Sequence, residues 1–532
     1  MTNIVADIEA TAEDHPDATA IAADGRDVSY RDFWTRTGRF AAALSEYGIE
    51  PSDRVALYLP NVPDFLAAFH GVLRAGGVVV PMNPQYKARE IGHLLADSGA
   101  RLVVTLADLV PRVEAVMDDT DVTQVVSVGG EGNDADGADP GGTGEEGHTT
   151  SFEAFLSEKG TPVAPRADDD VAVQPYTSGT TGQPKSVLLT HSNVAWDVRV
   201  SASLMDGGVK ESDKFLGVLP LFHIYGMTVT MVAVLFEGGT YYPMPAWDAG
   251  EALSLVEREN LTVMHGVPAM FNDVVNQENA DEFDLSTVRF ANSGGDSLPA
   301  AVMDRFEELY GIELYEGYGL TETSPVTHAN APGHRRPGSI GKPIEGVDAR
   351  IVDAEFKEVA RVERGPVNEA TADLDAITGE LVIAGPNVMQ GYHDRPDASE
   401  EVFTEAGGKR WFHTGDVGYW DEEGFFYVDD REKHVIVTGG YNVYPREVEE
   451  LLYEHPDVAD AAVVGVPDER RNETVKAYVV PVPGSDVTAE QVREYCLSNL
   501  AEYKHPREVE FREELPRTTT GKVQKFELAD AD

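Results

Sequence analysis

The segment Tyr176-Thr-Ser-Gly-Thr-Thr-Gly-Gln-Pro-Lys-Ser-Val187 lies between a predicted strand and a helix-like run. Gly179 and Gly182 allow the backbone to turn sharply, and the hydroxyl groups around them can donate hydrogen bonds to phosphate oxygens. Lys185 adds a positive charge to the same segment. This combination predicts a loop that holds the phosphates of a nucleotide.

The loop differs from the P-loop of Walker-type NTPases, which has a longer spacing between its glycines and a glycine directly before the lysine. Here Pro184 precedes the lysine, and a proline has no N–H to offer a phosphate. A solvated surface turn is the alternative for such a composition. The nucleotide contacts predicted for this loop are Thr177, Ser178, Gly179, Thr180, Thr181, Gly182 and Lys185.

Length and composition indicate a large enzyme. The chain has 532 residues, 42% of them hydrophobic, which predicts roughly two to four units with separate cores. No apolar run approaches the roughly 18 residues of a membrane-spanning helix, and the N-terminus has no basic leader. We therefore expect a cytoplasmic protein without an integral membrane segment. The single cysteine, Cys496, excludes an intrachain disulfide and a cysteine metal cluster.

The charge balance is strongly acidic, with 93 acidic against 42 basic residues and a net charge of −51. Such a surface repels phosphate backbones and anionic lipid heads, so we expect neither nucleic acid nor a peripheral membrane as a partner. Molar salt screens this repulsion within about 3 Å, so we also expect a halophilic source. Retention of soluble, active protein in dilute buffer would contradict that expectation.

Residues 1–160 have the alternating helical and strand-like periodicity of an α/β fold. Examples are the predicted helix Tyr30–Tyr47, the predicted strand Arg54–Leu59 and the predicted helix Val62–Ala75. The segment Gly129–Thr150 is rich in glycine, aspartate and glutamate, and we predict a solvated loop there.

The periodicity changes twice further along the chain. Residues 340–427 are rich in hairpin patterns, and after Asp430 helices and strands alternate again, beginning with the predicted helix Pro445–Tyr453. We therefore predict an N-terminal domain of residues 1–430 and a C-terminal domain of residues 431–532.

Further motifs follow the loop in a fixed order. They are Leu219-Pro-Leu-Phe-His-Ile-Tyr-Gly226, Tyr315-Glu-Gly-Tyr-Gly-Leu-Thr-Glu-Thr323, Trp411-Phe-His-Thr-Gly-Asp416 with Asp430-Arg-Glu-Lys433, and Pro516-Arg-Thr-Thr-Thr-Gly-Lys522. With these motifs nearly the whole chain resembles the adenylate-forming superfamily of acyl-CoA synthetases, nonribosomal adenylation domains and luciferases. The resemblance implies an α/β fold. It comprises a large N-terminal domain of αβ-layered subdomains plus a β-barrel-like part, and a small mobile α+β C-terminal domain.

The resemblance assigns nucleotide contacts to the segment Tyr315–Thr323. Gly317 lets a nucleotide approach the backbone closely, and Tyr318 offers a ring face to adenine. Thr321 can bond to the α-phosphate, and Glu322 offers a hard oxygen ligand to Mg²⁺. A helix cap is the structural alternative for this segment.

The resemblance also assigns a ribose site, a hinge and a mobile lysine. Asp416 stands in a Thr-Gly turn and is suited to accept hydrogen bonds from ribose hydroxyls, and Arg431 is assigned to the same ribose. Lys433 is the hinge about which the C-terminal domain rotates. Lys522 bonds the carboxylate and α-phosphate oxygens as negative charge moves onto pyrophosphate. No general base is required, because the substrate carboxylate is already the nucleophile.

The thioester half of the reaction needs a second surface. The segment Thr438–Pro445 resembles the lining of a pantetheine channel, in which Gly439 and Gly440 permit backbone contact with a slim substrate. A strand-to-helix turn with a proline at the first helical position is the alternative. The resemblance makes His223 a wall between the acyl and thiol sites, whereas a satisfied core histidine is the alternative.

The chain departs from the family pattern in three places. Glu316 stands where glutamine is common, and His434 stands where an acidic residue often follows the hinge lysine. The longer acidic segment Phe356–Ile377 replaces a short glycine turn. These departures affect local geometry and remove no group that the reaction requires.

We therefore predict an ATP-dependent, AMP-forming acyl-CoA synthetase. The catalytic residues expected are Lys522, Thr321, Glu322 and His223. The expected ligands are ATP, Mg²⁺ at Glu322, coenzyme A and a small-molecule carboxylic acid. Since His265–Phe271 and Ser293–Gly295 resemble pocket walls with room for a chain, we expect a medium- or long-chain fatty acid or a similar apolar acid.

Several alternatives stay open at this point. The acyl group could pass to a carrier protein in trans, or the acid could be aromatic or short. An acidic nucleotide-binding scaffold without catalysis is the non-enzymatic alternative. The sequence does not decide between a monomer and a homodimer.

Overall fold

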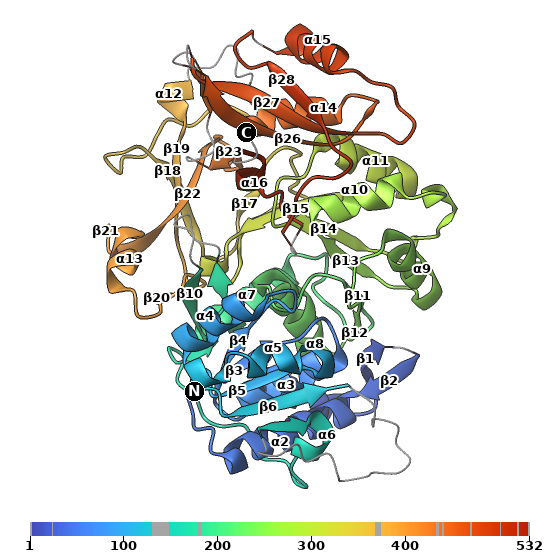
Figure 1. The fold of residues 1–532 in the computed structure, drawn as a ribbon, viewed down its shortest axis with the longest axis vertical. Coiled ribbons are helices and arrows are strands. Elements are labelled where there is room, and N and C mark those ends of the chain that lie inside the picture. Colours follow the sequence, from blue (N-terminus) through green and yellow to red (C-terminus); the bar gives the residue numbers. More distant parts are fainter. Residues whose placement is uncertain are drawn as a thin grey trace.

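The computed structural model describes residues 3–23, 25–129, 148–177, 184–367, 374–431, 436–438, 441–468, 471–500, 502–518 and 521–529. These residues form a large N-terminal part with three sheets and a smaller C-terminal part with one sheet (Figure 1). This mixed α/β architecture confirms the predicted fold class. The boundary at residues 430 and 431 and the mobility of the C-terminal part stay predictions. Among the described helices, none is both long and apolar enough to cross a membrane.

The first sheet carries the predicted phosphate-binding loop. In spatial order its strands are β20 (Gly391–Tyr392), β10 (Lys185–Thr190), β8 (Val171–Val173), β4 (Val78–Pro81), β3 (Arg54–Tyr58), β5 (Leu102–Leu106), β6 (Gln124–Val128) and β7 (Thr149–Ser151), with β9 (Tyr176–Thr177) beside β10. Alternate residues of β3 enter two cores. Val55 and Leu57 pack with α2 (Tyr30–Tyr47) and α3 (Pro63–Arg74), whereas Ala56 and Tyr58 pack with α4 (Ala88–Ser98). Helices therefore cover both faces of this mostly parallel sheet.

The second sheet has the carboxyl ends of several parallel strands at one edge. In spatial order its strands are β17 (Lys342–Pro343), β16 (Val326–Ala329), β15 (Leu314–Gly319), β14 (Phe290–Gly294), β13 (Val263–Gly266), β11 (Lys214–Gly217), β12 (Thr240–Pro243), β1 (Thr19–Ala23) and β2 (Arg26–Ser29). Strands β11, β13, β14 and β15 run parallel, so their carboxyl ends share one edge. Ligands of such sheets bind outside this edge.

Helices pack on both faces of the second sheet. One face carries α9 (Ala249–Glu259), α10 (Pro268–Asn276) and α11 (Ala300–Tyr310). The other face packs against the π-helical turn η3 (Tyr225–Val232) and α8 (Ala233–Phe236). That second core also contains α2, α3 and α7 (His191–Ser203), so it joins the first two sheets into one body.

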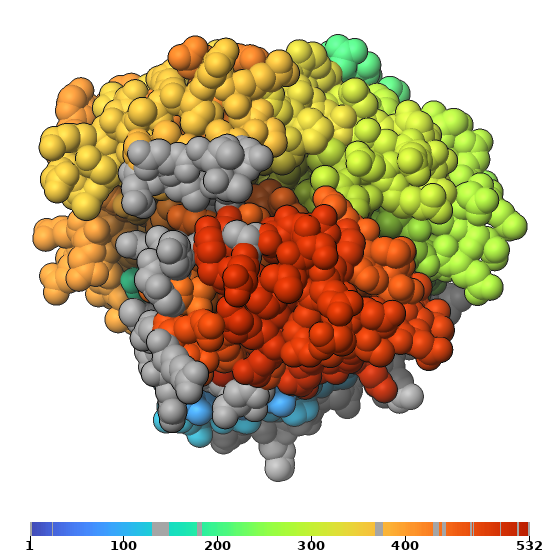
Figure 2. All heavy atoms as spheres, turned by 90° about the horizontal axis from the view of Figure 1, so that it is seen from above, coloured from blue at the N-terminus to red at the C-terminus, as the bar shows by residue number. Residues whose placement is uncertain are grey.

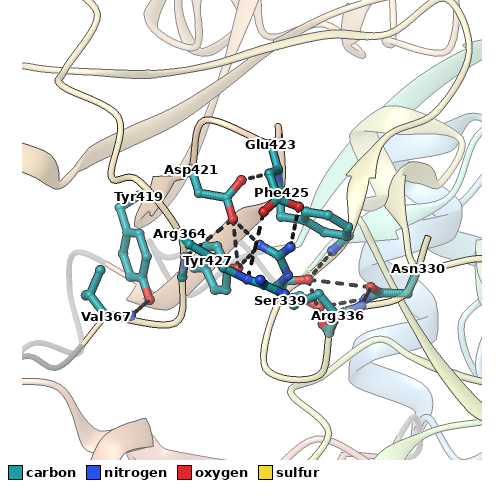
Figure 3. A network of polar contacts seen from close by, with 12 residues as sticks. Asn330, Arg336, Ser339, Arg364, Val367, Tyr419, Asp421, Glu423, Phe425 and Tyr427 are labelled. Carbon is teal, nitrogen blue, oxygen red and sulfur yellow. Dashed lines mark hydrogen bonds and ion pairs between the residues drawn. The ribbon is translucent and has the colours of Figure 1, made fainter.

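The third sheet is antiparallel, with β18 (Asp348–Val352), β19 (Gly379–Ala384), β22 (Lys409–Trp420), β21 (Phe403–Ala406) and β23 (Phe426–Arg431). A buried polar network lies at one end of β22 and β23 (Figure 3). Arg336 donates to the carboxylate of Asp421 and, at 2.6 Å, to Glu423. The network also reaches the described beginning of the acidic segment, where the amide of Gly365 donates to Asp421 at 3.4 Å.

Removal of the Asp421 charge is expected to destabilise this sheet. Asp421 is fully buried, so Asp421→Asn leaves the Arg336 guanidinium without its buried charged partner, which costs about 3–5 kcal/mol. The control Glu423→Gln removes the half-exposed partner of the same arginine and is expected to cost under about 1 kcal/mol. Thermal unfolding of both variants checks this, and equal losses would contradict it.

The C-terminal part has its own sheet, with β25 (Tyr441–Val443), β24 (Ile436–Thr438), β27 (Asn472–Pro481) and β26 (Val458–Asp468), and with β28 (Glu508–Phe511) beside β27. Helices α14 (Pro445–Tyr453) and α15 (Ala489–Asn499) cover one face. Leu528 of α16 (Lys525–Ala529) packs on the other face. Cys496 of α15 is buried, and burial raises the pKa of its thiol to about 12, as expected of an inert cysteine.

The C-terminal part contacts the third sheet and the helices α10 and α11 of the N-terminal part. Figure 2 shows it in red beside the yellow and orange residues of the third sheet and the green residues of α10 and α11. Asn272 of α10 donates to the carbonyl of Ala459 at 3.2 Å, and Arg446 of α14 donates to the carbonyl of Val428 at 2.5 Å.

One local prediction is wrong, and a second is wrong at its end. The segment predicted to bind phosphate is flanked by two antiparallel strands, since Lys185 of β10 pairs with Thr177 of β9, and the helix α7 begins only at His191. Of the predicted solvated loop at residues 129–150, residues 130–147 lie outside the described residues, and only its last two residues, Thr149 and Thr150, belong instead to strand β7, which pairs with β6. Backbone pairing at a sheet edge thus overrides the polar composition of Thr149 and Thr150.

Candidate functional site

A cavity of about 1140 Å³ lies where the sheets and the C-terminal part meet. Of the predicted site residues, its lining contains Thr177, Lys185, His223, Gly317, Tyr318, Thr321, Glu322 and Lys522. The carboxyl ends of β13, β14 and β15 form one wall, as the parallel order of these strands predicts. Residues far apart in the sequence therefore share one site.

Tyr392 of β20 joins Glu322 to Lys185. Its hydroxyl donates to Glu322 Oε1 at 3.0 Å, and Lys185 Nζ lies 5.0 Å from the centre of its ring. Burial, and next the charge of Glu322, raise the pKa of Tyr392 above its usual value, so the tyrosine stays protonated. The sequence alone did not predict this residue. Its place next to Lys185 depends on the pairing of β20 with β10, which no local pattern reveals.

The predicted adenine and ribose residues contact each other. The Tyr318 hydroxyl donates to the carboxylate of Asp416, which is buried. Strand pairing places Asp416 opposite Arg431 on β23, and the side chain of Arg431 lies outside the described residues. Asp416 therefore contacts Tyr318 through its side chain and lies opposite Arg431 in the strand pairing.

Glu380 and His413 shape the turn that leads to Asp416. His413 Nδ1 lies 2.7 Å from Glu380 Oε2, and the amide of Gly415 donates to Glu380 Oε1 at 3.0 Å. All three residues line the cavity. The sequence did not predict Glu380, because its contact with the turn crosses from β19 to β22.

Asn61 fixes the segment that carries His223. Its side-chain amide donates to the carbonyls of Gly217 and Leu219 at 2.9 Å each, and its Oδ1 accepts from the amide of Leu221 at 2.8 Å. Asn61 is buried. It is a further residue that the sequence did not predict, since about 160 positions separate it from its partners.

His223 is neutral at physiological pH. Burial, and next the positive charge of Lys522, lower its pKa to about 4. Its Nδ1 accepts from the amide of Tyr225 at 3.3 Å, so Nε2 carries the ring proton. A small pocket next to the main cavity is lined by both His223 and Lys522.

The cavity wall formed by α7, η3 and β16 is largely apolar. Its side chains include Ala202, Met205, Val229 and Val326. A polar cluster interrupts this wall, where the Tyr225 hydroxyl lies 3.1 Å from His265 Nδ1 and accepts from Asn292 Nδ2 at 2.7 Å. The segments expected to form pocket walls thus contribute residues to the cavity, among them His265, Gly294 and Gly295.

Several predicted site residues lie outside the described part of the chain. They are Ser178, Gly179, Thr180, Thr181, Gly182, Lys433, Gly439 and Gly440, together with the departure His434. Among the described residues between 436 and 445, none lines the cavity. Pro445 is the first residue of α14, so the backbone here makes the strand-to-helix turn, and the pantetheine contacts stay a prediction.

The departure at Glu316 has a measurable consequence. Glu316 is 2% exposed, and its Oε2 has no hydrogen-bond partner among the described residues. Burial raises the pKa of its carboxyl to about 7, and the charge of Arg446 only partly opposes this shift. The ionised carboxylate is therefore disfavoured in the folded state at neutral pH.

The pKa of the Glu316 carboxyl is higher in the folded state than in the unfolded state. Between these two pKa values the folded state therefore keeps a proton that the unfolded state loses. This group then lowers stability as pH rises from about 4.5 to about 7, and its penalty is complete above that window. We expect Glu316→Gln to match the parent protein near pH 4.5 and to exceed its stability at pH 8, by on the order of 3 kcal/mol. Unfolding measured across this range tests it, with exposed Glu345→Gln as control. Parallel curves for parent and Glu316→Gln would refute it.

Comparison with known proteins identifies the family. The family model described as AMP-binding enzyme matches residues 8–393, and the model for the AMP-binding enzyme C-terminal domain matches residues 447–522. The long-chain-fatty-acid–CoA ligase of Bacillus subtilis (strain 168) is 36% identical, covering 97% of this chain and 92% of the relative. The feruloyl-CoA synthase of Amycolatopsis sp is 35% identical, covering 96% of each chain.

Solved structures of similar proteins agree with this result. The anthranilate CoA ligase AuaEII in complex with anthranoyl-AMP is 26% identical, with a TM-score of 0.89 over 100% of this chain and 97% of that one. The benzoate CoA ligase from Burkholderia xenovorans LB400 is 26% identical, with a TM-score of 0.84 over 99% and 100%. The chain therefore belongs to the AMP-binding enzyme family, as an adenylate-forming acid–thiol ligase.

Proposed function

We propose that this ligase activates a medium- or long-chain fatty acid, or a similar apolar carboxylate, and transfers the acyl group to coenzyme A. The apolar wall of Ala202, Met205, Val229 and Val326 supports this proposal, because such side chains favour an alkyl chain over a polar acid. The identity of 36% with a long-chain-fatty-acid–CoA ligase is in line with it.

In the first half-reaction, a carboxylate oxygen of the acid attacks the α-phosphorus of ATP. The new C–O–P linkage forms as the bond to pyrophosphate breaks. Lys522 pairs with the oxygens that gain negative charge, and the neutral His223 separates the acid from the thiol site. Thr321 donates to the α-phosphate, and Tyr318 with Asp416 holds the nucleoside. The position of Lys522 in one cavity with Thr321 and Glu322 is the observation that carries this assignment.

The residues present fit a magnesium ion bound together with ATP. The described chain has no group of three or more carboxylate, histidine or cysteine ligands, and Glu322 offers a hard oxygen in the cavity that Lys185 also lines. Mg²⁺ is commonly held by one or two carboxylates together with substrate phosphates and water. When bound, it neutralises phosphate charge. Tyr392 keeps the Glu322 carboxylate oriented toward that role.

In the second half-reaction, the thiol sulfur of coenzyme A attacks the acyl carbon and AMP leaves. We propose that rotation about Lys433 withdraws Lys522 and brings residues 438–445 to the cavity. In the present arrangement, none of the described residues among 438–445 lines the cavity, which is in line with such an exchange.

An aromatic acid is the second candidate. The polar cluster of Tyr225, His265 and Asn292 supports it, since it could bond to a ring substituent. The feruloyl-CoA synthase relative is 35% identical, nearly as similar as the fatty-acid ligase.

A panel of acids with ATP and Mg²⁺, with and without coenzyme A, tests the proposal in high salt. We expect pyrophosphate release and thioester formation with medium- and long-chain fatty acids at higher kcat/KM than with benzoate or ferulate. Preference for the aromatic acids would overturn the substrate class. Pyrophosphate release without any thioester would favour a carrier protein as acceptor, and no pyrophosphate release would favour the scaffold alternative.

A further inference from the structure

Backbone hydrogen bonds hold the described ends of the loop that carries Lys522. Arg517 and Val523 face each other as an isolated antiparallel bridge, and the amide of Thr518 donates to the carbonyl of Lys522 at 2.7 Å. The amide of Gly521 donates back to the carbonyl of Thr518 at 2.9 Å. The direction in which Lys522 leaves the turn therefore depends on the peptide that precedes it, between Gly521 and Lys522.

Arg517 holds that peptide. Its Nη1 donates to the Gly521 carbonyl at 2.7 Å, and its Nη2 donates to Asp460 Oδ2 at 2.5 Å. Both side chains are largely buried, with 25% and 15% of their surface exposed. A single planar guanidinium thus connects the loop to a carboxylate on the sheet, a geometry that a lysine cannot reproduce.

Asp460 is in turn fixed on the C-terminal sheet. Its Oδ1 accepts from the Tyr453 hydroxyl at 2.5 Å and from the amide of Ala461 at 2.9 Å. Tyr453 ends α14 and Asp460 stands in β26, so both belong to regular elements of the C-terminal core. The carboxylate that receives Arg517 therefore cannot rotate freely.

The same loop is seated against the N-terminal part. Gly521 has φ of +84°, and a Cβ at this position would lie 2.7 Å from Val267 Cγ2, so only glycine fits this close approach. Asn272 of α10 binds the carbonyl of Ala459, the residue before Asp460. Arg517 itself lines the cavity. The pair is thus located where the two parts of the chain meet.

We propose that Arg517 and Asp460 are positioning residues of the adenylation half-reaction, which aim Lys522 by fixing the Gly521 carbonyl. The pair acts through Lys522, and the proposal rests on the proposed role of that lysine. Since the loop that the pair holds serves adenylation, the pair contributes little to acyl transfer from a preformed acyl-AMP.

The test measures the two half-reactions separately in Arg517→Gln and Asp460→Asn, each alone and combined with Lys522→Ala. We expect each single variant to lose about 10²-fold in kcat for adenylation, with little change in the KM for ATP, because a displacement of about 1 Å has such an effect. Thioester formation from supplied acyl-AMP should change less than about twofold. In the Lys522→Ala background, neither variant should reduce adenylation further. Arg517→Lys should not restore the rate.

Arg493→Gln is a matched control in the same part of the chain. Arg493 also pairs with one carboxylate, that of Glu490, and donates to one carbonyl, that of Arg507 at 3.2 Å, but it does not touch the loop. Both half-reactions should stay unchanged in this variant.

Three results would overturn the proposal. They are equal losses in both half-reactions, a further loss in the Lys522→Ala background, and full adenylation by Arg517→Gln when Lys522→Ala is impaired. The last of these leaves the role of Lys522 standing. By contrast, full adenylation by Lys522→Ala would overturn the role of Lys522 itself.

Discussion

Replacement of Lys522 by alanine is expected to slow acyl-adenylate formation by about 10²–10³-fold, the usual cost of one aimed donor in a water-poor site. Lys522 lies on the cavity together with Thr321 and Glu322. Acyl transfer from supplied acyl-AMP to coenzyme A should continue at nearly the parent rate, because the leaving AMP does not require this charge. Pyrophosphate release and thioester formation, each measured in a single turnover, check the expectation.

Lys525→Ala provides a control for the loss of a lysine near the C-terminus. Lys525 forms an ion pair with Glu449 at 2.8 Å and does not line the cavity. Its variant should retain adenylation. Equal losses in the two half-reactions of Lys522→Ala would show that Lys522 supports the structure and does not stabilise the transition state.

Replacement of Lys433 by proline is expected to abolish acyl transfer while adenylation continues. Lys433 lies outside the described residues, between strand β23 and strand β24. Proline fixes φ near about −65° and removes an N–H, so rotation at this position would be blocked. The described arrangement already has Lys522 at the cavity and needs no rotation for the first step. We expect thioester formation from supplied acyl-AMP to fall by about 10²-fold or more.

Lys433→Ala separates the backbone effect from the loss of the side chain. Alanine keeps the N–H and the freedom of φ, so this variant should transfer the acyl group far better than the proline variant. If Lys433→Pro makes acyl-CoA from acyl-AMP at the parent rate, Lys433 is not the pivot.

Helices with strong local signals could be predicted from the sequence. The predicted helix Tyr30–Tyr47 has the bounds of α2, because Ser29 accepts from the amide of Asp32 at its start and Gly48 adopts φ of +97° at its end. The predicted helix Pro445–Tyr453 likewise has the bounds of α14, with proline at its first position. Such ends depend on adjacent residues alone.

Strand edges were harder to predict, since their partners are distant in the sequence. The predicted strand Arg54–Leu59 is confirmed as β3, which is buried on both faces and reads as an apolar run. By contrast, β7 has a polar sequence and exists only through its pairing with β6. Backbone hydrogen bonds of this kind leave no pattern in the strand itself.

The candidate site follows the same division. The residues of the motifs were predicted by their spacing, and eight of them line one cavity. The residues that hold these motif residues in place could not be predicted. Asn61, Tyr392 and Asp460 each form a hydrogen bond to a motif that is distant in the sequence. A single polar residue in an unrelated segment carries no signal of the contact it will make.

Detection of the intermediate is the most direct measurement of the central claim. The protein is mixed in high salt with ATP, Mg²⁺ and a long-chain fatty acid without coenzyme A, and the quenched reaction is analysed by mass spectrometry. The account predicts acyl-AMP in amounts close to the enzyme concentration, released as acyl-CoA and AMP once coenzyme A is added. Formation of acyl-CoA with no acyl-AMP detectable before or during the reaction, or hydrolysis of ATP to ADP in place of AMP, would contradict it.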